Sequence, residues 1–411
     1  MQQDTRTGRG RQGAQIVIGV DIAKATHLAV VQGPDGWRSK PLRVPNTAAG
    51  FTQLLGHAQA AETRWPGVPV GVALEPTGHY WLPLAHWLTA RQIPVWLVNP
   101  AHTKWAKELE DNSPQKTDPK DARVIADLAA AGKARPCALR TGVYATLRAL
   151  ATLRRRVARD LTAVRNQLHR LCDQLFPEFL PCFGGHLDRL SCRALLAVAP
   201  TPEALLALGI DGVTAVLTHA SHHRLGRARA LVLVAAAQTS IAVREGAAPL
   251  VAHLHYLLAD YDRLRAYQDT LEGQQATALQ AVPYARQLLA VPGLGVVTVA
   301  TLLGETGDLR QYARAAQLLK LAGLTLYEIS SGQHQGQRRI TKRGRPGLRR
   351  ILYMAALRLV KAHGPFRGYY DRLTTRLNST PALVAVMRKL LRVLYARVRA
   401  GELVVNQYCV A

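Results

Sequence analysis

Two short apolar runs, each followed at once by a carboxylate, constrain the fold of this chain more than any other feature. Residues 16–20 lead into Asp21, and residues 68–74 lead into Glu75. Apolar runs of this length are typical of buried strands. A carboxylate at the end of a buried strand is costly unless it is paired or binds a metal. The pattern therefore predicts a sheet with a paired or metal-binding acidic edge.

The other elements of the first 135 residues predict a mixed α/β domain. Further strands are expected at residues 27–32, 42–45 and 95–98. Helices are expected at residues 47–62, at 80–91 and in two later stretches, the second from about 118 through 128. A turn signal at residues 33–36 makes the first three strands an antiparallel meander. This order of elements matches the ribonuclease-H-like fold, and it also fits any doubly wound sheet.

Two more carboxylates, Asp118 and Asp121, lie at the predicted start of the last helix. Pro119 suits a first helical turn, which makes Asp118 the N-cap, and the i, i+3 spacing puts Asp121 on the same side. Taken singly, Asp118 is explained as a cap and Asp121 as an acid that suits the helix dipole. Together with Asp21 and Glu75 they supply the oxygen ligands that Mg²⁺ prefers. A pair of such ions stabilises the attacking and leaving oxygens of a phosphodiester exchange.

The balance of charge indicates a polyanionic partner. The 411 residues include 53 Lys and Arg against 27 Asp and Glu, a formal net charge of +26. Excess charge of one sign destabilises a compact state through self-repulsion, whereas neutralising phosphates releases counterions and strengthens binding. Nucleic acid is therefore the expected partner.

Cysteine spacing and hydropathy narrow the class further. The five cysteines show no C-x-x-C spacing, so neither a structural zinc nor a disulfide framework is expected. Residues 1–14 are polar and basic and lack the apolar core of a signal peptide. No segment approaches the roughly 20 apolar residues that span a bilayer. We expect a cytoplasmic protein that contacts the chromosome and has no membrane partner.

Heptad spacing predicts two long helices in the central region. The first apolar seam comprises Leu150, Leu153, Val157, Leu161, Val164, Leu168, Leu171 and Leu175. The second comprises Leu254, Leu257, Tyr261, Leu264, Tyr267 and Leu271. Such helices pack either on each other or on another protomer, and the pattern alone does not separate the two. Residues 183–245, between them, are also expected to be helical.

The C-terminal region carries two candidate phosphate-binding features. Gly293 and Gly295 lie in a turn between two apolar helical stretches, as in a helix-hairpin-helix, where backbone N–H groups approach a phosphate. A plain helix-turn-helix corner is the alternative. Residues 338–350 follow as a predicted phosphate-contacting loop. Its candidate contacts are Arg338, Arg339, Lys342, Arg343, Arg345, Arg349 and Arg350.

These residues resemble the DEDD transposases of bacterial insertion sequences, a family described as bridge-RNA-guided recombinases. The N-terminal resemblance rests on residues 19–24, 75–78 and 116–122. The C-terminal resemblance is stronger and rests on residues 292–295, 321–324, 331–332, 341–344, 348–350 and 389–391.

The resemblance implies a domain plan and a chemistry. The implied parts are a RuvC-like domain with a DEDD tetrad at 15–135, a helical coiled-coil region at 136–285 and a helical transposase domain at 286–411. Residues 1–14 depart from the family by extending before the first strand, and they are expected to be either a basic RNA-binding arm or disordered. It also implies Mg²⁺ and a serine nucleophile before a glycine, which maps to Ser331, with Ser330 as the neighbouring candidate. Family members form a phosphoserine link to DNA and act as homo-oligomers, dimers and tetramers. Their noncoding bridge RNA pairs with donor and target double-stranded DNA.

Two other functions are compatible with parts of the sequence. In a junction-resolving endonuclease, metal-activated water would cut DNA and Ser331 would be idle. A non-catalytic nucleic-acid-binding protein would account for the net charge of +26 but not for the four carboxylates. Because no His–Asp pair lies near Ser331 to activate its hydroxyl, we expect Ser331 to meet the acidic tetrad across a domain or protomer boundary.

Overall fold

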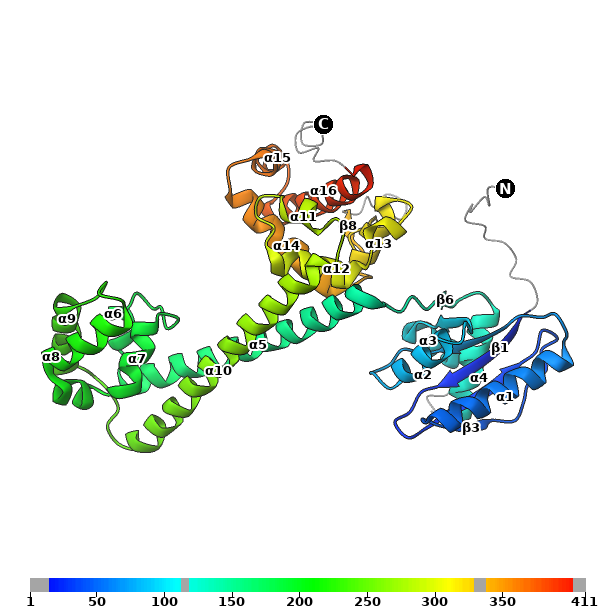
Figure 1. Ribbon diagram of the computed structural model, residues 1–411, viewed down its shortest axis with the longest axis horizontal. Helices are drawn as coiled ribbons and strands as arrows, with labels where there is room; N and C mark the ends of the chain where they lie inside the picture. Colours follow the sequence, from blue (N-terminus) through cyan, green and yellow to red (C-terminus); the bar gives the residue numbers. More distant parts are fainter. Residues whose placement is uncertain (1–14, 112–117, 329–337, 402–411) are drawn as a thin grey trace. The chain divides into compact units, whose positions relative to one another are not determined.

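The computed structural model describes residues 15–111, 118–328 and 338–401, with only the backbone described at residues 110, 111, 118 and 119 (Figure 1). The chain forms two compact units, Met1–Leu139 and Arg140–Ala411. The first is a mixed α/β unit and the second is almost entirely helical, which confirms the predicted α/β sheet followed by helices.

A six-stranded sheet forms the centre of the first unit, in the order β3-β2-β1-β4-β5-β6. Its strands are β1 (Ile16–Asp21), β2 (Thr26–Gln32), β3 (Leu42–Pro45), β4 (Val70–Leu74), β5 (Val95–Leu97) and β6 (Arg135–Pro136). β1, β2 and β3 are antiparallel neighbours, as the sequence predicts, whereas β4 runs parallel to both β1 and β5. The two-residue strand β6, which the sequence analysis does not predict, pairs antiparallel with β5.

Helices cover both faces of this sheet. The helices of the unit are α1 (Ala48–Arg64), α2 (Trp81–Thr89), α3 (Pro100–Asp111) and α4 (Asp118–Ala130). Ile16, Ile18 and Val20 of β1 pack into a core with residues of α1 and α2. Val17 points to the opposite face and packs against Ile125, Ala126 and Ala129 of α4. The alternation of β1 therefore assigns its odd-numbered residues to the face that α4 covers.

Gly19 allows α4 to approach the sheet closely. A Cβ at this position would lie 2.2 Å from the carbonyl oxygen of Ala122 and 2.6 Å from the backbone nitrogen of Ala126. No side chain larger than hydrogen fits in that space, because the neighbouring atoms belong to helix backbone. Val17 packs against the end of α4, at Ala129, whereas Gly19 contacts an earlier part of the same helix, at Ala122 and Ala126. The start of α4 therefore lies towards the acidic end of β1.

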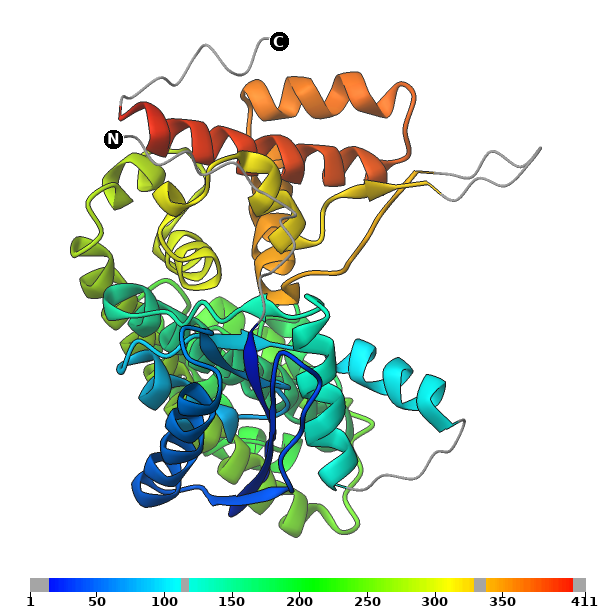
Figure 2. The ribbon, with the colours of Figure 1, turned by 90° about the vertical axis from the view of Figure 1, so that its right-hand side faces the viewer.

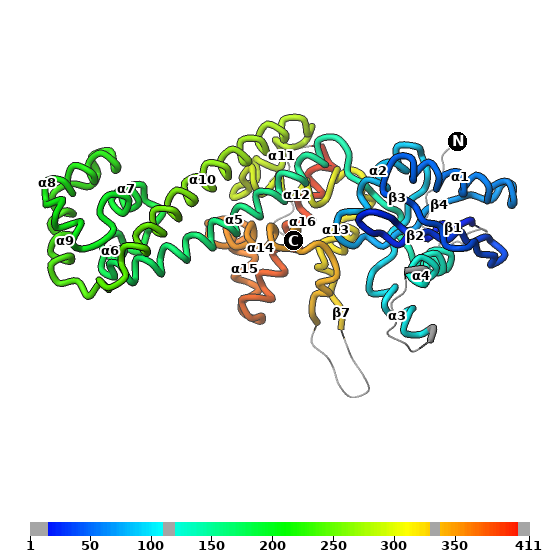
Figure 3. Tube along the Cα trace, turned by 90° about the horizontal axis from the view of Figure 1, so that it is seen from below, coloured from blue at the N-terminus to red at the C-terminus, as the bar shows by residue number. Residues whose placement is uncertain are grey.

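Two helices of 34 residues form the axis of the second unit, α5 (Gly142–Leu175) and α10 (Ala247–Gln280). They lie side by side along much of their length (Figures 1 and 3). Most of the predicted apolar seam is buried between them, including Leu161 and Leu168 of α5 and Leu257 and Leu264 of α10. The predicted helices thus pack on each other within one chain, and pairing with another protomer stays a prediction.

Short helices lie at one end of this pair: α6 (Phe179–Cys182), α7 (Leu190–Val198), α8 (Pro202–Ala220) and α9 (Arg227–Gln238). The last three lie within residues 183–245, where helices are expected. Hydropathy predicts no membrane-spanning segment, but among the described residues α8 has the length and apolar composition of one. Its backbone is interrupted at Gly209, where φ is 68°. Leu205, Val213 and Leu217 of α8 are buried in the same core as α5 and α10, but only 17% of its apolar window is buried.

The other end of the pair carries a helical bundle. Its elements are α11 (Ala285–Leu289), α12 (Val296–Thr306), the 3₁₀ helix η1 (Leu309–Gln311), α13 (Ala315–Ala322), α14 (Pro346–Lys361), α15 (Pro365–Thr374) and α16 (Ser379–Ala400). α12 packs on α5 so closely that a Cβ at Gly304 would lie 2.8 Å from the carbonyl oxygen of Leu147. Arg140 donates to the carbonyl oxygens of Gly304 and Glu305 at this junction.

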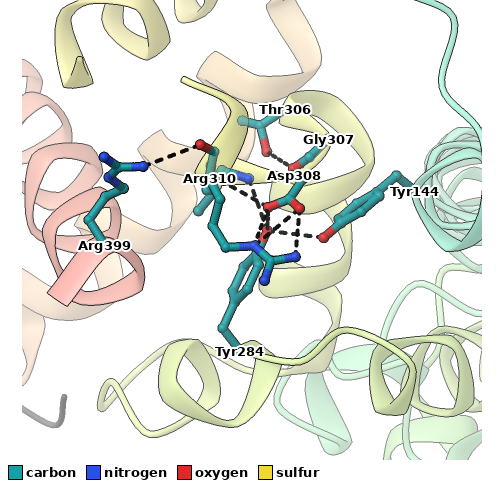
Figure 4. A network of polar contacts seen from close by, with 8 residues as sticks. Tyr144, Tyr284, Thr306, Gly307, Asp308, Arg310 and Arg399 are labelled. Carbon is teal, nitrogen blue, oxygen red and sulfur yellow. Dashed lines mark hydrogen bonds and ion pairs between the residues drawn. The ribbon is translucent and has the colours of Figure 1, made fainter. Parts of the chain in front are cut away.

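A buried tyrosine fixes the start of α5 to the bundle (Figure 4). Tyr284 donates from Oη to Asp308 Oδ1 (3.0 Å) and accepts from the backbone N–H of Leu309 (2.9 Å). The hydroxyl of Tyr144, on α5, lies 3.2 Å from the same Oη. Arg310 closes the cluster by pairing with Asp308, Nη2 to Oδ2 at 2.8 Å.

Candidate functional site

Asp21 and Glu75 lie side by side at one edge of the sheet. β1 and β4 are parallel, with Val20 opposite Leu74, so the register continued by one residue puts Asp21 beside Glu75. Each carboxylate lies two positions after a residue that faces α4, because Gly19 meets Ala122 and Ala73 packs with Val17 in the same core. Each is partly buried. The predicted acidic edge thus has two neighbouring carboxylates on the α4 face.

Asp121 lies in the first turn of α4, only 3% exposed. Its Oδ1 lies 2.5 Å from Nζ of Lys107 on α3, and the Lys107 side chain is itself only 21% exposed. A buried carboxylate requires a cation close by, and here an ammonium group supplies that charge. Asp118 begins the same helix, and its side chain lies outside the described residues.

The described carboxylates fit a divalent cation in chemistry but do not yet form a cluster. Within residues 15–111, 118–328 and 338–401, no three His, Cys, Asp or Glu side chains are close enough together to hold a metal. Asp21, Glu75 and Asp121 are hard oxygen donors of the kind that Mg²⁺ prefers. The fourth predicted ligand, Asp118, lies three residues before Asp121 on the same helix, and its side chain is outside the described residues. The four-carboxylate metal site therefore stays a prediction.

His27 stabilises the loop directly after Asp21. The side chain is fully buried, and its Nδ1 accepts a hydrogen bond from the backbone N–H of Ala23, 3.2 Å away. Its ring stacks on Phe51 at a centroid distance of 6.1 Å. Burial lowers the pKa of His27 below its ordinary value of 6.5, so the imidazole is neutral and a proper acceptor for that bond.

The predicted phosphate-binding turn joins α11 to α12. Gly293 adopts a left-handed conformation, with φ of 83°, and Gly295 is the N-cap of α12. No side chain caps that helix, so the first N–H groups of α12 lack helical partners.

The predicted basic loop at residues 338–350 is only partly a loop, and the sequence analysis is wrong in this respect. Arg339 belongs to β8 (Arg339–Ile340), which pairs with β7 (Leu326–Tyr327), and Figure 2 shows this ribbon leading away from α16. Arg349 and Arg350 belong to the first turns of α14, because Pro346 starts a helix. Lys342 and Arg343 lie in the exposed connection between β8 and α14.

Some of these basic side chains have internal partners. Arg349 donates to the carbonyl oxygens of Ala322 and Lys342, at 3.0 and 3.2 Å, and Arg345 donates to the carbonyl oxygen of Glu305. Arg338 pairs with Glu328, Nε to Oε2 at 2.9 Å. The sequence predicts all of these basic residues alike as phosphate contacts. Arg350 differs from Arg338, Arg345 and Arg349 because it forms no hydrogen bond or ion pair with another described residue.

The candidate nucleophile Ser331 and its neighbour Ser330 lie outside the described residues, in the segment between β7 and β8. Sequence reasoning did not single out Lys107, since a lysine on a polar helix is usually solvated. The available signal is its position on the helix just before Asp118 and Asp121, in a chain that is otherwise poor in acids.

Comparisons with protein-family models identify two matching segments of the chain. A family model for DEDD-type transposases matches residues 18–177, and a model described as transposase of the IS116/IS110/IS902 family matches residues 285–371.

Similar proteins match over nearly their whole length. The chain is 26% identical to an IS110 insertion-element protein of Streptomyces coelicolor, covering 94% of each chain. It is 29% identical to an IS116 insertion-element protein of Streptomyces clavuligerus, covering 95% of this chain and 96% of the relative. It is 24% identical to a pilin gene-inverting protein of Moraxella lacunata, covering 94% and 96%. The chain therefore belongs to the DEDD transposases of the IS110 family, and it is an enzyme of the DNA transposase and recombinase class.

Proposed function

We propose that this enzyme exchanges DNA strands through a covalent phosphoserine link at Ser331, with Mg²⁺ held by Asp21, Glu75, Asp118 and Asp121 and with a noncoding bridge RNA as guide. One observation supports the proposal most strongly: Asp21 and Glu75 end neighbouring parallel strands on the face that the start of α4 covers. The sheet order, with three antiparallel strands followed by parallel β4 and β5, supports a RuvC-like assignment of this unit.

The proposed reaction is a transesterification. The Ser331 oxygen attacks a backbone phosphorus, a phosphoserine bond forms, and the DNA oxygen leaves with a proton as a free hydroxyl. In the second half, a hydroxyl of the partner strand attacks the same phosphorus and releases the serine. Because each broken phosphodiester is replaced by another ester, no water and no external energy source are consumed.

The acidic residues would serve this reaction by binding and orientation. A bound Mg²⁺ would supply charge for the phosphate oxygens at the reacting centre. Asp21 and Glu75 lie on strand ends, which are rigid supports, and Asp121 is held in the first turn of a helix packed on the sheet. Lys107 holds the Asp121 side chain in place by pairing with its Oδ1.

The experiment that tests the proposal is a search for a covalent protein–DNA adduct. Purified protein, co-expressed with the RNA that flanks its own gene, is incubated with donor and target DNA and Mg²⁺ and analysed on a denaturing gel. We expect an adduct with wild type and with Ser330→Ala, and none with Ser331→Ala or Asp118→Asn.

The other outcomes distinguish the remaining possibilities. An adduct lost in Ser330→Ala but not in Ser331→Ala would move the nucleophile by one position. Cleavage without an adduct that survives both serine substitutions would indicate a hydrolytic junction endonuclease. An adduct that forms equally well without the RNA would remove the guide from the proposal.

A further inference from the structure

A cavity of about 460 Å³ lies where α5, α12 and α14 meet. Four arginines line it: Arg154 and Arg155 from α5, and Arg350 and Arg358 from α14. The first residues of α12, from Gly295 to Thr298, form another wall. The cavity thus joins the central pair of helices to the C-terminal bundle, both within the second unit.

The acidic side chains at this cavity already have cationic partners. Glu272 accepts from Nε and Nη2 of Arg154, at 2.9 and 2.6 Å. Glu305 is 3% exposed and pairs with Arg148, which lies outside the cavity lining. Within the described parts of the chain, Arg155 and Arg350 form no ion pair. Arg350 is exposed, so its positive charge is available to a ligand. Arg155 Nη1 lies beside Gly347, as does Glu305 Oε1, and forms no salt bridge with that carboxylate.

Two further features of the cavity suit a phosphate. The guanidinium of Arg358 lies within 3.4 Å of the Thr298 hydroxyl oxygen, a contact that anchors this arginine beside the first turn of α12. Because that helix has no side-chain cap, its first N–H groups and its dipole favour an anion there. Arginine guanidiniums are also the groups best shaped to hold a phosphate through paired bonds.

The size and the other walls indicate a ligand larger than an inorganic ion. A volume of 460 Å³ lies within the range of sites for organic ligands. Val296, Ile351 and Met354 add apolar surface, which suits the sugar of a nucleotide unit. A neighbouring cavity of about 300 Å³ along α5 is different, because its arginines Arg165 and Arg193 are paired with aspartates.

We propose that the cavity between α5, α12 and α14 binds a backbone phosphate and sugar of nucleic acid, so that α5 is part of the nucleic-acid interface and not only a packing helix. The choice of nucleic acid as the ligand rests on the proposed function. DNA and RNA share the phosphodiester that the cavity would bind. A DNA probe and an RNA probe therefore distinguish which of the two nucleic acids occupies it.

Two neighbouring arginines of α5 give a matched comparison. Arg155 lines the cavity, whereas Arg156 is exposed and does not. Full-length Arg155→Ala, Arg350→Ala and Arg156→Ala are titrated with a labelled DNA duplex and with a labelled RNA hairpin, at several salt concentrations. Arg155→Ala and Arg350→Ala should weaken binding of at least one probe by roughly ten-fold. They should also lower the slope of log affinity against log salt by about one. Arg156→Ala should change both much less.

The outcomes decide both the site and its ligand. Loss with only one probe assigns the cavity to DNA or to RNA. Equal affinities and slopes for Arg155→Ala and Arg156→Ala with both probes would overturn the proposal. If Arg155→Ala unfolds, two other variants carry the test. Arg155→Lys keeps the charge but loses the planar guanidinium, and Arg350→Ala changes an exposed residue. The two proposals can fail separately. If wild type forms no serine adduct but Arg155→Ala binds nucleic acid more weakly than wild type, the proposed chemistry fails and this binding site stands.

Discussion

Lys107 of α3 and Asp121 of α4 form an ion pair, Nζ to Oδ1 at 2.5 Å, in which the Asp121 side chain is 5% exposed. The lysine supplies a positive charge at a carboxylate that is also a candidate Mg²⁺ ligand. Removing one member of a buried pair leaves the other charge uncompensated. In the proposed metal site, the Lys107 ammonium and Mg²⁺ would therefore compete for the Asp121 carboxylate.

Lys107→Met should destabilise the metal-free protein and tighten its binding of divalent cations. Because Lys107 is 21% exposed, we expect a loss of about 1–3 kcal/mol, below the range for a fully buried pair. Thermal unfolding with and without Mg²⁺ measures this, and Mg²⁺ should raise the Tm of Lys107→Met more than that of wild type. Lys104, also on α3 but exposed and only loosely paired with Glu108, provides the control Lys104→Met. A variant as stable as wild type, with no gain from Mg²⁺, would show that Lys107 is not the counter-charge of Asp121.

Gly19→Ala should destabilise the first unit because the added Cβ would meet the backbone of Ala122 and Ala126. Overpacking of this kind costs about 1–3 kcal/mol. Gly56, an exposed residue of α1 with open space around it, is the control. Gly56→Ala should stabilise by about 0.5–1 kcal/mol through helix propensity. Urea unfolding of the two variants should move in opposite directions, and a neutral Gly19→Ala would mean that α4 is not seated as closely as the backbone indicates.

Much of the first unit could be predicted because its strands are short, apolar and cleanly bounded. β3 was predicted at its observed bounds, β1 ends at the expected carboxylate Asp21, and β4 ends directly before Glu75. The two-residue strand β6 has no periodicity to detect, since it exists only through its pairing with β5. Gly19 was noted as part of a motif, but its role in admitting α4 depends on a contact more than 100 residues away.

The sequence singles out the acidic residues of the candidate site, but it does not show which basic residues contact them. Asp21, Glu75 and Asp121 stand out because a carboxylate is expensive at a buried strand or helix end. Lysines and arginines are common in this chain, so sequence alone could not tell that Lys107 reaches Asp121 or that Arg349 bonds carbonyl oxygens. Nothing in the sequence singles out Arg155, because its cavity is formed by three separate helices.

His27 should make the stability of the first unit depend on pH below about 6.5. Its folded pKa lies below the ordinary value of 6.5, because burial disfavours the charged ring. Below 6.5 the unfolded chain binds a proton that the folded chain does not, so stability is complete above this pH and falls as the pH drops towards the folded pKa. Hydrogen exchange of β1 and β2 amides between pH 7 and pH 5 reports this, with rates corrected for intrinsic exchange. His27→Gln should flatten the dependence, and an unchanged slope would place the titrating group elsewhere.

Tyr284→Phe should loosen the junction between α5 and the C-terminal bundle. Burial raises the pKa of Tyr284, so its hydroxyl stays protonated and donates to Asp308. Without that hydroxyl, Asp308 loses a donor and the buried N–H of Leu309 loses its acceptor, which costs about 1–3 kcal/mol for a group left unsatisfied. Tyr256, 66% exposed on α10, gives the control Tyr256→Phe. Faster amide exchange at Leu309 and a lower Tm in Tyr284→Phe alone are expected. Equal behaviour of the two variants would mean that water replaces the hydroxyl and that the packing of α12 on α5 holds the junction by itself.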